Sequence, residues 1–509
     1  MQKQKITKNI VYSSVNYIVV YALRFISRIV FINTLPIEYL GINGLFSNIL
    51  SVLSLVELGI GPAIIFSLYK PLALKDTETI KSIMRFYKKA YTCIGTIVFG
   101  LGFILYPFLD YFIKGNHGIP ELQYFYLVYV ANAGISYFWA YKRNLLIADQ
   151  KYYEFNIIQM YVHAAVTFCQ IALLVFTKNY WSFVLLMLAG TIFENLLSAR
   201  QADKEYPYLA ERAADLVPSI KNEIIKNTKA MLAHKIGGIV FFSSSNLIIS
   251  KFVGLAAVGI YSNYCIVTNT INYLTSKLAG TITASIGHMI VTDTDEQKIK
   301  IFKVTQFFAS FQSSLITVGF YVLINPFVEL WVGSAYLFNK ATVAAFVFSF
   351  YLTCMRKNVL MFHDACGLFW YDRYKPLAES VINLIASVYL AKEYGIVGVL
   401  YGNIISTMLT CFWIEPYVLF RYGIKYPLTS YYKDYFEYTG LTALTALALD
   451  QLYTIFIPVN NVLTFIACML AIIVLVALFW SLVFYNREEY RDIKSSIVGK
   501  LKGFFIYKK

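Results

Sequence analysis

Apolar runs of roughly 20 residues, divided by polar connections, recur along the whole chain. A run of this length forms a helix that crosses the hydrocarbon core of a bilayer. The pattern therefore predicts an all-α polytopic membrane protein with about fourteen transmembrane helices. They are expected near residues 10–33, 41–69, 90–113, 122–147, 154–176, 180–199, 231–252, 257–283, 301–325, 341–362, 376–391, 396–420, 435–457 and 461–485.

The composition of the chain is also that of a membrane protein. Its 509 residues are 58% hydrophobic and only 14% charged, whereas soluble domains carry about 25% charged residues. The seven cysteines lie in or beside apolar runs without a CxxC pair, which indicates small buried side chains rather than disulfides. The five histidines have no metal-ligand spacing, and no Ser/His/Asp set or nucleotide-binding loop is discernible. No catalytic residue, cofactor or metal is expected.

Lysine and arginine are distributed unequally between the two sides of the predicted helices. With the N-terminus inside, the inner termini and connections, counted together with the inner ends of the adjoining helices, hold 36 of the 44 basic residues. The outer connections and outer helix ends hold 5. This bias obeys the positive-inside rule and predicts that both termini lie in the cytoplasm. The net charge of +15 thus reflects topology, and no basic-aromatic binding module indicates nucleic acid as a partner.

Two similar stretches indicate an internal repeat. "YLGINGLFSNIL" (39–50) follows the first predicted helix and "AVGIYSNYCIV" (257–267) follows the seventh, so that Gly41 aligns with Gly259. Parallel repeats are a known transporter plan, with the substrate site between the halves. The predicted domains are an N-lobe at 1–200, a cytoplasmic linker at 201–230, a C-lobe at 231–422, a C-terminal helix pair at 423–485 and a basic cytoplasmic tail at 486–509.

The first predicted helix carries two arginines within an apolar sequence. Tyr17, Tyr21, Arg24 and Arg28 are spaced 4, 3 and 4 residues apart and so share one face. An arginine at the middle of a membrane helix costs about 2.5–3.5 kcal/mol on insertion scales. Arg28 could instead extend to the outer headgroups. For Arg24 we expect a water-filled cavity that attracts anions.

Polar residues also follow one face of the second predicted helix. Asn43 and Ser47 begin this row, and Glu57 lies at its end. Glu57 could be a counter-ion for Arg24, a hydrogen-bonded buried carboxyl or a protonatable coupling residue. The sequence leaves these three readings open.

A third polar row lies in the eighth predicted helix. It includes Asn263, Tyr273 and Lys277, of which Lys277 either faces a cavity or reaches the inner membrane interface. Cationic faces in both halves would form an electropositive cleft. An anionic ligand with a large polar appendage fits such a cleft, with its charge held by arginine and its appendage by hydroxyls, amides and aromatic rings.

Several longer motifs carry a family resemblance. Four blocks resemble the Gram-positive branch of Wzx-type polysaccharide flippases: "YLGINGLFSNILSVLSLVELGIGPAIIFSLYKPLA" (39–73), "YKRNLLIADQKYY" (141–153), "LIISKFVGLAAVGIYSNY" (247–264) and "HDACGLFWYDRYKPLAESVINLIASVYLAKEYGIVGVLYG" (363–402). These belong to the multidrug/oligosaccharidyl-lipid/polysaccharide exporter superfamily. The resemblance implies two six-helix lobes, two further C-terminal helices and a V-shaped cationic cavity that opens alternately to each side of a bacterial cell membrane.

The resemblance also implies a substrate and partners. The substrate is an undecaprenyl-diphosphate-linked oligosaccharide, moved from the inner to the outer leaflet for capsule or exopolysaccharide synthesis. The diphosphate would bind Arg24, Arg28 and Lys277 while the lipid tail stays in the bilayer. Membrane lipids, a polysaccharide polymerase and assembly proteins are the expected partners. H⁺ or Na⁺ could be a coupling ion, and we expect a monomer.

Three positions depart from the family pattern. Ser245 in "SSSN" stands where a carboxylate is usual, His288 replaces an asparagine and Asn403 replaces a threonine. The first departure places in doubt any mechanism that needs an acid there. The alternatives are a flippase for a lipid-linked peptidoglycan precursor, a multidrug exporter of the same superfamily and, with less support, a membrane polysaccharide polymerase or ligase.

Two acidic positions lie in apolar sequence outside these motifs. For Glu415 and Asp450 we expect structural hydrogen bonds with partners that the sequence does not identify. The stretch "HDACGLFWYDRY" (363–374) is expected to form a turn on the inner side, in which Asp364, Asp372 and Arg373 pair or cap locally.

Overall fold

The computed structural model describes residues 2–57, 59–114, 119–368, 370–456 and 461–495, without the side chains of some residues in α1, η1, α8, α9 and α16. These residues fold into seventeen α-helices with short 3₁₀ and π segments. Eight helical segments are long and apolar enough to cross a membrane, and the helices Ile37–Leu53 and Ile60–Leu74 are apolar but shorter. The described part of the chain is therefore an all-α, multi-helix membrane protein.

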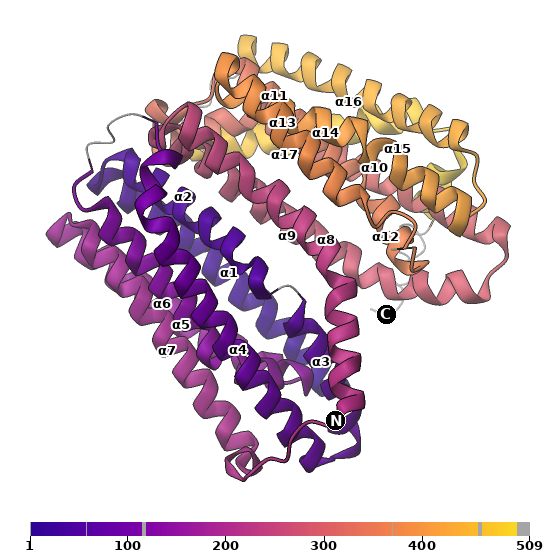
Figure 1. Ribbon diagram of the computed structural model, residues 1–509. Coiled ribbons are helices and arrows are strands. Elements are labelled where there is room, and N and C mark those ends of the chain that lie inside the picture. The colour runs from indigo at the N-terminus through magenta and orange to yellow at the C-terminus, as the bar shows by residue number, and fades with distance from the viewer. Residues whose placement is uncertain (1, 58, 115–118, 369, 457–460, 496–509) are drawn as a thin grey trace, which may run out of the picture. The chain divides into compact units, whose positions relative to one another are not determined.

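Contacts divide the chain into two compact units, residues 1–262 and 263–509. In unit 1, α4 packs on α5, α5 on α7, α1 on α6, and both α2 and α3 on α8 (Figure 1). The helices of this unit are α1 Gln2–Thr34, α2 Ile37–Leu53, α3 Ile60–Leu74, α4 Thr77–Leu105, α5 Leu122–Ala148, α6 Tyr152–Thr177, α7 Tyr180–Glu205, α8 Pro218–Phe252 and the start of α9 Leu255–Thr292.

Unit 2 has its own core, in which α10 packs on α11, α16 and α17, and α13 packs on α14. Trp480 and Phe484 of α17 are fully buried against aromatic side chains of α10 and α16. The helices of this unit are the remainder of α9, α10 Asp295–Val332, α11 Lys340–Met355, α12 Lys357–Ala365, α13 Lys375–Tyr394, α14 Ile396–Leu409, α15 Cys411–Val418, α16 Leu428–Phe456 and α17 Val462–Phe484.

The span predicted near 41–69 is not one continuous helix. Helices α2 and α3 are separated by a 3₁₀ turn at Ser54–Glu57 and by Gly59, whose φ of 81° is left-handed. Glycine adopts this conformation without a Cβ penalty, so the chain can turn there inside an apolar sequence. The span predicted near 341–362 is likewise divided at Arg356, between α11 and α12.

Helix α8 begins earlier than expected. It starts at Pro218, so the second half of the predicted linker continues directly into the helix near 231–252. Proline suits the first helical position because its missing N–H has no helical partner there. The linker between α7 and α8 is therefore short, and it contains a 3₁₀ turn at Pro207–Ala210.

The two glycines aligned by the repeat lie at one crossing between α2 and the start of α9. A Cβ on Gly41 would lie 2.0 Å from the backbone oxygen of Leu255, and a Cβ on Gly259 would lie 2.8 Å from that of Ile37. Leu255 precedes Gly259 by four residues, as Ile37 precedes Gly41. The contact is thus reciprocal, which supports the internal repeat.

Because backbone atoms occupy this space, Gly41→Ala should destabilise the protein by about 1–3 kcal/mol, the usual effect of overpacking. The thermal unfolding midpoint of the purified protein measures the change. Gly100→Ala is the matched control, since a Cβ there meets nothing within 4 Å. An unfolding midpoint for Gly41→Ala equal to that of the control would contradict the close crossing.

Candidate functional site

Helix α1 presents three different faces. One face carries Asn16, Leu23 and Phe31, which are buried, and α1 packs on α6. A second face is apolar and exposed, with Ile18 65% and Ile26 50% accessible. The third face carries the predicted row of tyrosines and arginines. An apolar exposed face suits lipid, whereas an exposed row of polar side chains suits water.

The polar row of α1 forms a connected ladder. The rings of Tyr17 and Tyr21 have centroids 4.1 Å apart, and the guanidinium of Arg24 lies 5.0 Å from the centroid of the Tyr21 ring. Arg28 is half-buried and its Nη1 donates a hydrogen bond of 3.2 Å to Oγ of Ser262 at the start of α9. Arg24 is exposed. The structure thus brings the four predicted residues together on one surface of unit 1.

Amide side chains fix the rotation of α1 against α6. Asn16 Nδ2 donates to Gln159 Oε1 at 2.7 Å and to Asn156 Oδ1 at 3.3 Å. Asn156 Nδ2 in turn donates to Ser13 Oγ at 2.8 Å. This cluster was not identified from the sequence, although an asparagine within an apolar helix was a possible signal. The cluster fixes how α1 is rotated against α6 and so determines the direction in which the arginine face of α1 points.

The polar row of α2 bonds mainly along its own helix. Ser47 Oγ donates to Asn43 Oδ1 at 3.4 Å, and Ser51 Oγ donates to the Ser47 carbonyl at 2.8 Å. Ser47 is exposed and Asn43 is half-buried. Ser47 thus lies on the accessible surface of α2, as its predicted binding role requires.

Glu57 occupies the 3₁₀ turn after α2. The hydroxyl of Tyr91 donates to Glu57 Oε1 at 2.5 Å, and the Tyr87 ring lies against Tyr91 with centroids 4.5 Å apart. Asn144 donates to the Tyr87 hydroxyl. The described contacts of Glu57 are therefore those of a hydrogen-bonded carboxyl, and its roles as counter-ion or coupling residue stay hypotheses.

The predicted residues of α9 are described only in part. Asn263 is fully buried, and among the described residues neither polar atom of its side chain has a hydrogen-bond partner. Tyr273 is half-buried. Lys277 lies in α9, but its side chain is outside the described residues. The binding roles of these three residues stay predictions.

Two of the three departures from the family pattern can be located. Ser245 is buried in α8. Asn403 is buried in α14, where its Oδ1 accepts a hydrogen bond of 2.6 Å from Asn383 Nδ2. The side chain of His288 is outside the described residues.

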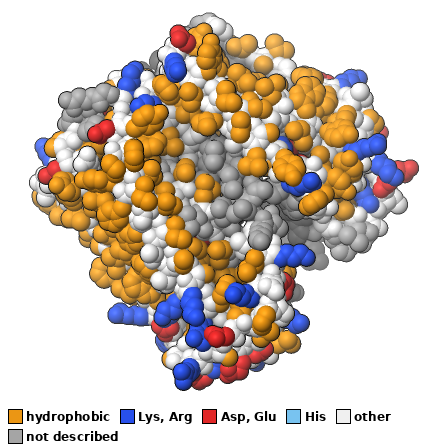
Figure 2. Space-filling view, viewed as in Figure 1, with side chains coloured by type: hydrophobic (Ala, Val, Ile, Leu, Met, Phe, Trp, Pro, Cys, Tyr) orange, Lys and Arg blue, Asp and Glu red, His pale blue; other side chains and the backbone are white. Residues whose placement is uncertain are grey.

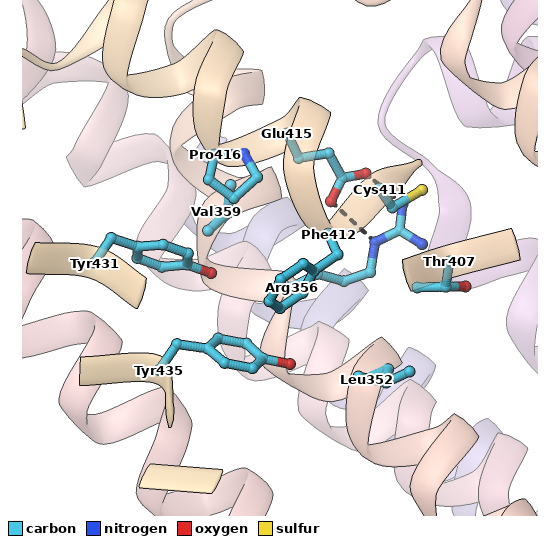
Figure 3. A pocket seen from close by; sticks show the side chains of 10 residues that line it. All are labelled: Leu352, Arg356, Val359, Thr407, Cys411, Phe412, Glu415, Pro416, Tyr431 and Tyr435. Carbon is cyan, nitrogen blue, oxygen red and sulfur yellow. Dashed lines mark hydrogen bonds and ion pairs between the residues drawn. The ribbon is translucent and has the colours of Figure 1, made fainter. Parts of the chain in front are cut away.

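Unit 2 contains a buried cluster of charges that sequence reasoning missed. Arg356 Nε donates to Glu415 Oε2 at 3.0 Å, and Lys375 Nζ contacts Glu415 Oε1 at 2.7 Å. Figure 3 shows the guanidinium of Arg356 and the carboxylate of Glu415 pointing toward each other. Arg356 also lies 3.5 Å from Glu379, whose Oε1 accepts a hydrogen bond from Thr407. Glu415 is completely buried.

The charge cluster extends to the turn between α12 and α13. Asp372 lies 2.8 Å from Lys375 Nζ and 3.4 Å from His363 Nε2. Burial raises the pKa of Asp372, but the contact with His363 and the charge of Lys375 outweigh it and lower the pKa to about 2. The predicted local pairing of Asp364, Asp372 and Arg373 is confirmed by these contacts, by Asp364 at 3.6 Å from His363 and by Arg373 on the Trp370 carbonyl.

The structure identifies the partners that the sequence could not. Glu415 has its two cations, and Asp450 Oδ2 lies 2.6 Å from Lys340 Nζ. The cavity beside Arg356 and Glu415, lined also by Tyr431 and Tyr435, measures about 20 Å³. A space of this size holds one water molecule. The charge cluster is therefore a packed structural element and cannot admit a sugar.

Comparison with known proteins agrees with this architecture. Residues 6–286, more than half of the chain, match the family model described as polysaccharide biosynthesis protein. The chain belongs to the polysaccharide biosynthesis protein family. A search of curated proteins gave no match.

Solved structures show the fold. A structure of the lipid II flippase MurJ in an inward-closed conformation aligns with a TM-score of 0.66 and 14% identity, over 94% of this chain and 99% of MurJ. An inward-facing multidrug resistance MATE family transporter of the MOP superfamily has a TM-score of 0.55 and 13% identity, over 81% and 98%. The MATE transporter VcmN of Vibrio cholerae has a TM-score of 0.53 and 15% identity, over 83% and 98%. This family member thus has a MurJ- and MATE-like fold, and it is a multi-pass membrane protein.

The charge cluster predicts a strong effect of removing one partner. Arg356→Met leaves Glu415 and Glu379 without their shared cation and should lower the free energy of unfolding by about 3–5 kcal/mol. The double variant Arg356→Met, Glu415→Met should recover much of this loss, because Lys375 keeps Asp372. Thermal unfolding measures both. The control is Arg421→Met, which removes an exposed cation; equal unfolding midpoints for Arg356→Met and Arg421→Met would contradict the cluster's role.

Proposed function

We propose that this protein is a flippase that moves undecaprenyl-diphosphate-linked oligosaccharide repeat units from the cytoplasmic to the outer leaflet of a bacterial cell membrane. The product serves capsular or exopolysaccharide synthesis. Membership in the polysaccharide biosynthesis family and the transporter fold support the proposal. The single observation that carries it is the exposed Arg24 within the tyrosine and arginine row of α1.

An exposed arginine near the middle of an apolar helix needs water around it. Arg24 lies at the middle of the apolar segment Tyr12–Thr34 of α1, beside exposed isoleucines on another face. Lipid contact would cost it about 2.5–3.5 kcal/mol or more. A water-filled cavity beside the tyrosine and arginine row removes this cost. The same cavity lets the guanidinium bind an anion.

The chemistry of the row suits a sugar diphosphate. Guanidinium groups bind phosphate oxygens with two parallel hydrogen bonds, and Arg24 and Arg28 are one helical turn apart on one face. Tyr17, Tyr21, Asn43 and Ser47 offer rings, hydroxyls and an amide to the glycan. In this proposal the lipid tail stays in the bilayer while the polar head crosses through the cavity.

The architecture that goes with this function has fourteen transmembrane helices. Two six-helix lobes, 1–200 and 231–422, would surround a V-shaped cavity, with the helix pair 423–485 beside them and Lys277 and Asn263 contributing from the second lobe. Rocking of the lobes would expose the cavity to each side in turn. The predicted topology places both termini in the cytoplasm.

Net movement of the substrate from the inner to the outer leaflet needs an energy source. A membrane potential negative inside favours outward movement of an anion by about 2.3 kcal/mol per charge per 100 mV. Glu57 is the candidate for coupling to H⁺ or Na⁺, and removal of product by a polymerase is the alternative source.

A second candidate function is a flippase for a lipid-linked peptidoglycan precursor. The alignment with the lipid II flippase MurJ over 94% of this chain favours it. That ligand is also a sugar diphosphate on a polyprenyl lipid, so a cationic cavity would serve both. The two functions differ in the glycan, which a complementation assay distinguishes.

The proposal predicts that Arg24→Ala lowers glycan export at least tenfold, because a hydrogen bond to a charged group contributes about 1.5–3 kcal/mol. The assay is surface polymer in a bacterium that lacks its own capsule or exopolysaccharide flippase. Arg24→Lys should retain part of the activity, since it keeps the charge but loses the bidentate geometry.

The control for this assay is Arg200→Ala, which removes an exposed cation from α7 away from the tyrosine and arginine row. It should export as the wild type does. Normal export by Arg24→Ala, at equal protein in the membrane, would contradict the proposed site. Rescue of a strain lacking its peptidoglycan-precursor flippase, but not of the capsule strain, would select the second candidate.

A further inference from the structure

A second cavity lies within unit 1, at the end of α4 and α5 next to the linker after α7. Its volume is about 510 Å³, and its walls include Lys81, Arg85 and Lys88 of α4 and Lys142 of α5. Figure 2 shows Lys and Arg side chains gathered at the lower end of the view, the end where Figure 1 draws this linker. The cavity is far larger than a single ion requires and lies within the range of ligand sites, about 300–1,000 Å³.

The linker forms one wall of this cavity and is held by ion pairs. Lys81 Nζ lies 2.8 Å from Glu211, and Arg85 Nη1 lies 3.2 Å from Asp215. Lys142 Nζ, 2.6 Å from Asp203, joins α5 to the end of α7. Arg85 Nη1 donates to the carbonyl of Ala213 at 2.7 Å. These contacts hold the linker against α4.

The lining carries a surplus of positive charge. Four cationic and two acidic side chains face the cavity. Lys81 is only 5% exposed and is fixed between Glu211 and Glu78. Lys88 is exposed, and the described residues include no acidic partner for it. Arg85 is 45% exposed, but its Nη1 already lies 3.2 Å from Asp215. Lys88 is thus the lining cation that is available to an anion that enters.

Two tyrosines complete the lining. Tyr141 and Tyr206 are both largely buried, and the Tyr206 hydroxyl already donates to Asp149 at 2.8 Å. Tyr141 adds an aromatic ring to the lining. A lining of this kind suits a phosphate attached to a larger organic group better than a bare ion, because the rings offer apolar contact beside the charge.

We propose that this cavity binds the phosphate of an anionic headgroup at the inner membrane surface. Lysine and arginine are the residues that bind phosphate oxygens, and basic pockets on the cytoplasmic side of membrane helices bind anionic lipid headgroups. The positive-inside distribution predicts that this end of unit 1 faces the cytoplasm. The site is separate from the tyrosine and arginine row of α1 and does not depend on glycan transport.

The test is native mass spectrometry of the purified full-length protein with phosphatidylglycerol or phosphatidylcholine. We expect the wild type to retain phosphatidylglycerol in preference to phosphatidylcholine. Lys88→Gln should retain about fivefold less phosphatidylglycerol than the wild type. Lys89→Gln is the matched control, because Lys89 is an exposed neighbour on the same helix that does not line the cavity. The control should retain lipid as the wild type does.

Thermal stabilisation by inorganic pyrophosphate tests whether the cavity binds the phosphate of a soluble compound rather than that of a lipid. Stabilisation of wild type and Lys89→Gln, but not of Lys88→Gln, supports the cavity as a phosphate site even where lipid retention is weak; it then assigns the site to soluble phosphate compounds. Equal behaviour of Lys88→Gln and Lys89→Gln in both assays overturns the proposal. So does the absence of any preference for phosphatidylglycerol together with no effect of pyrophosphate. Both assays measure binding, so their outcome is independent of the export assay.

Discussion

A charged side chain inside a bilayer needs either an opposite charge or water, and this constraint organises both units of the protein. In unit 2, Arg356, Lys375 and Glu415 satisfy one another across three segments of the chain. In unit 1, Arg24 remains exposed on α1. The first solution uses the charges to hold helices together, whereas the second, in the proposed function, keeps a cation available for a ligand.

The rotation of α1 about its axis determines which surroundings Arg24 faces. The amide cluster around Asn16 holds one face on α6, and Ile18 and Ile26 define an apolar exposed face. The tyrosine and arginine row occupies the remaining face. In the proposed function, these three faces would meet protein, lipid and the water of a transport cavity. The family match and the fold agree with this interpretation.

The sequence predicted much of the fold because hydropathy reports which segments are apolar. Helices α5, α6 and α17 begin and end within about two residues of their predicted limits. Hydropathy does not report backbone conformation, so the break at Gly59 inside an apolar stretch was missed. The start of α8 at Pro218 was assigned to the linker for a similar reason, since polar sequence alone does not show that a helix continues.

The candidate site was predictable only where periodicity brings residues together. Tyr17, Tyr21 and Arg24 share a face because they lie on one helix, and the structure confirms their contacts. Arg356, between α11 and α12, and Glu415 of α15 are 59 positions apart, and no local spacing connects them. The cavity beside Lys88 likewise depends on how the linker folds back onto α4.

The central claim is that water, not lipid, contacts the tyrosine and arginine row of α1. The most direct measurement is the reaction of a water-soluble, membrane-impermeant maleimide with single cysteines in a cysteine-free background. Tyr21→Cys and Ile18→Cys lie on neighbouring faces of the same helix, and thiols react as thiolates, which form in water and not in hydrocarbon. The account predicts rapid labelling of Tyr21→Cys and little labelling of Ile18→Cys. Equal protection of both, in a protein that folds and reaches the membrane, would contradict it.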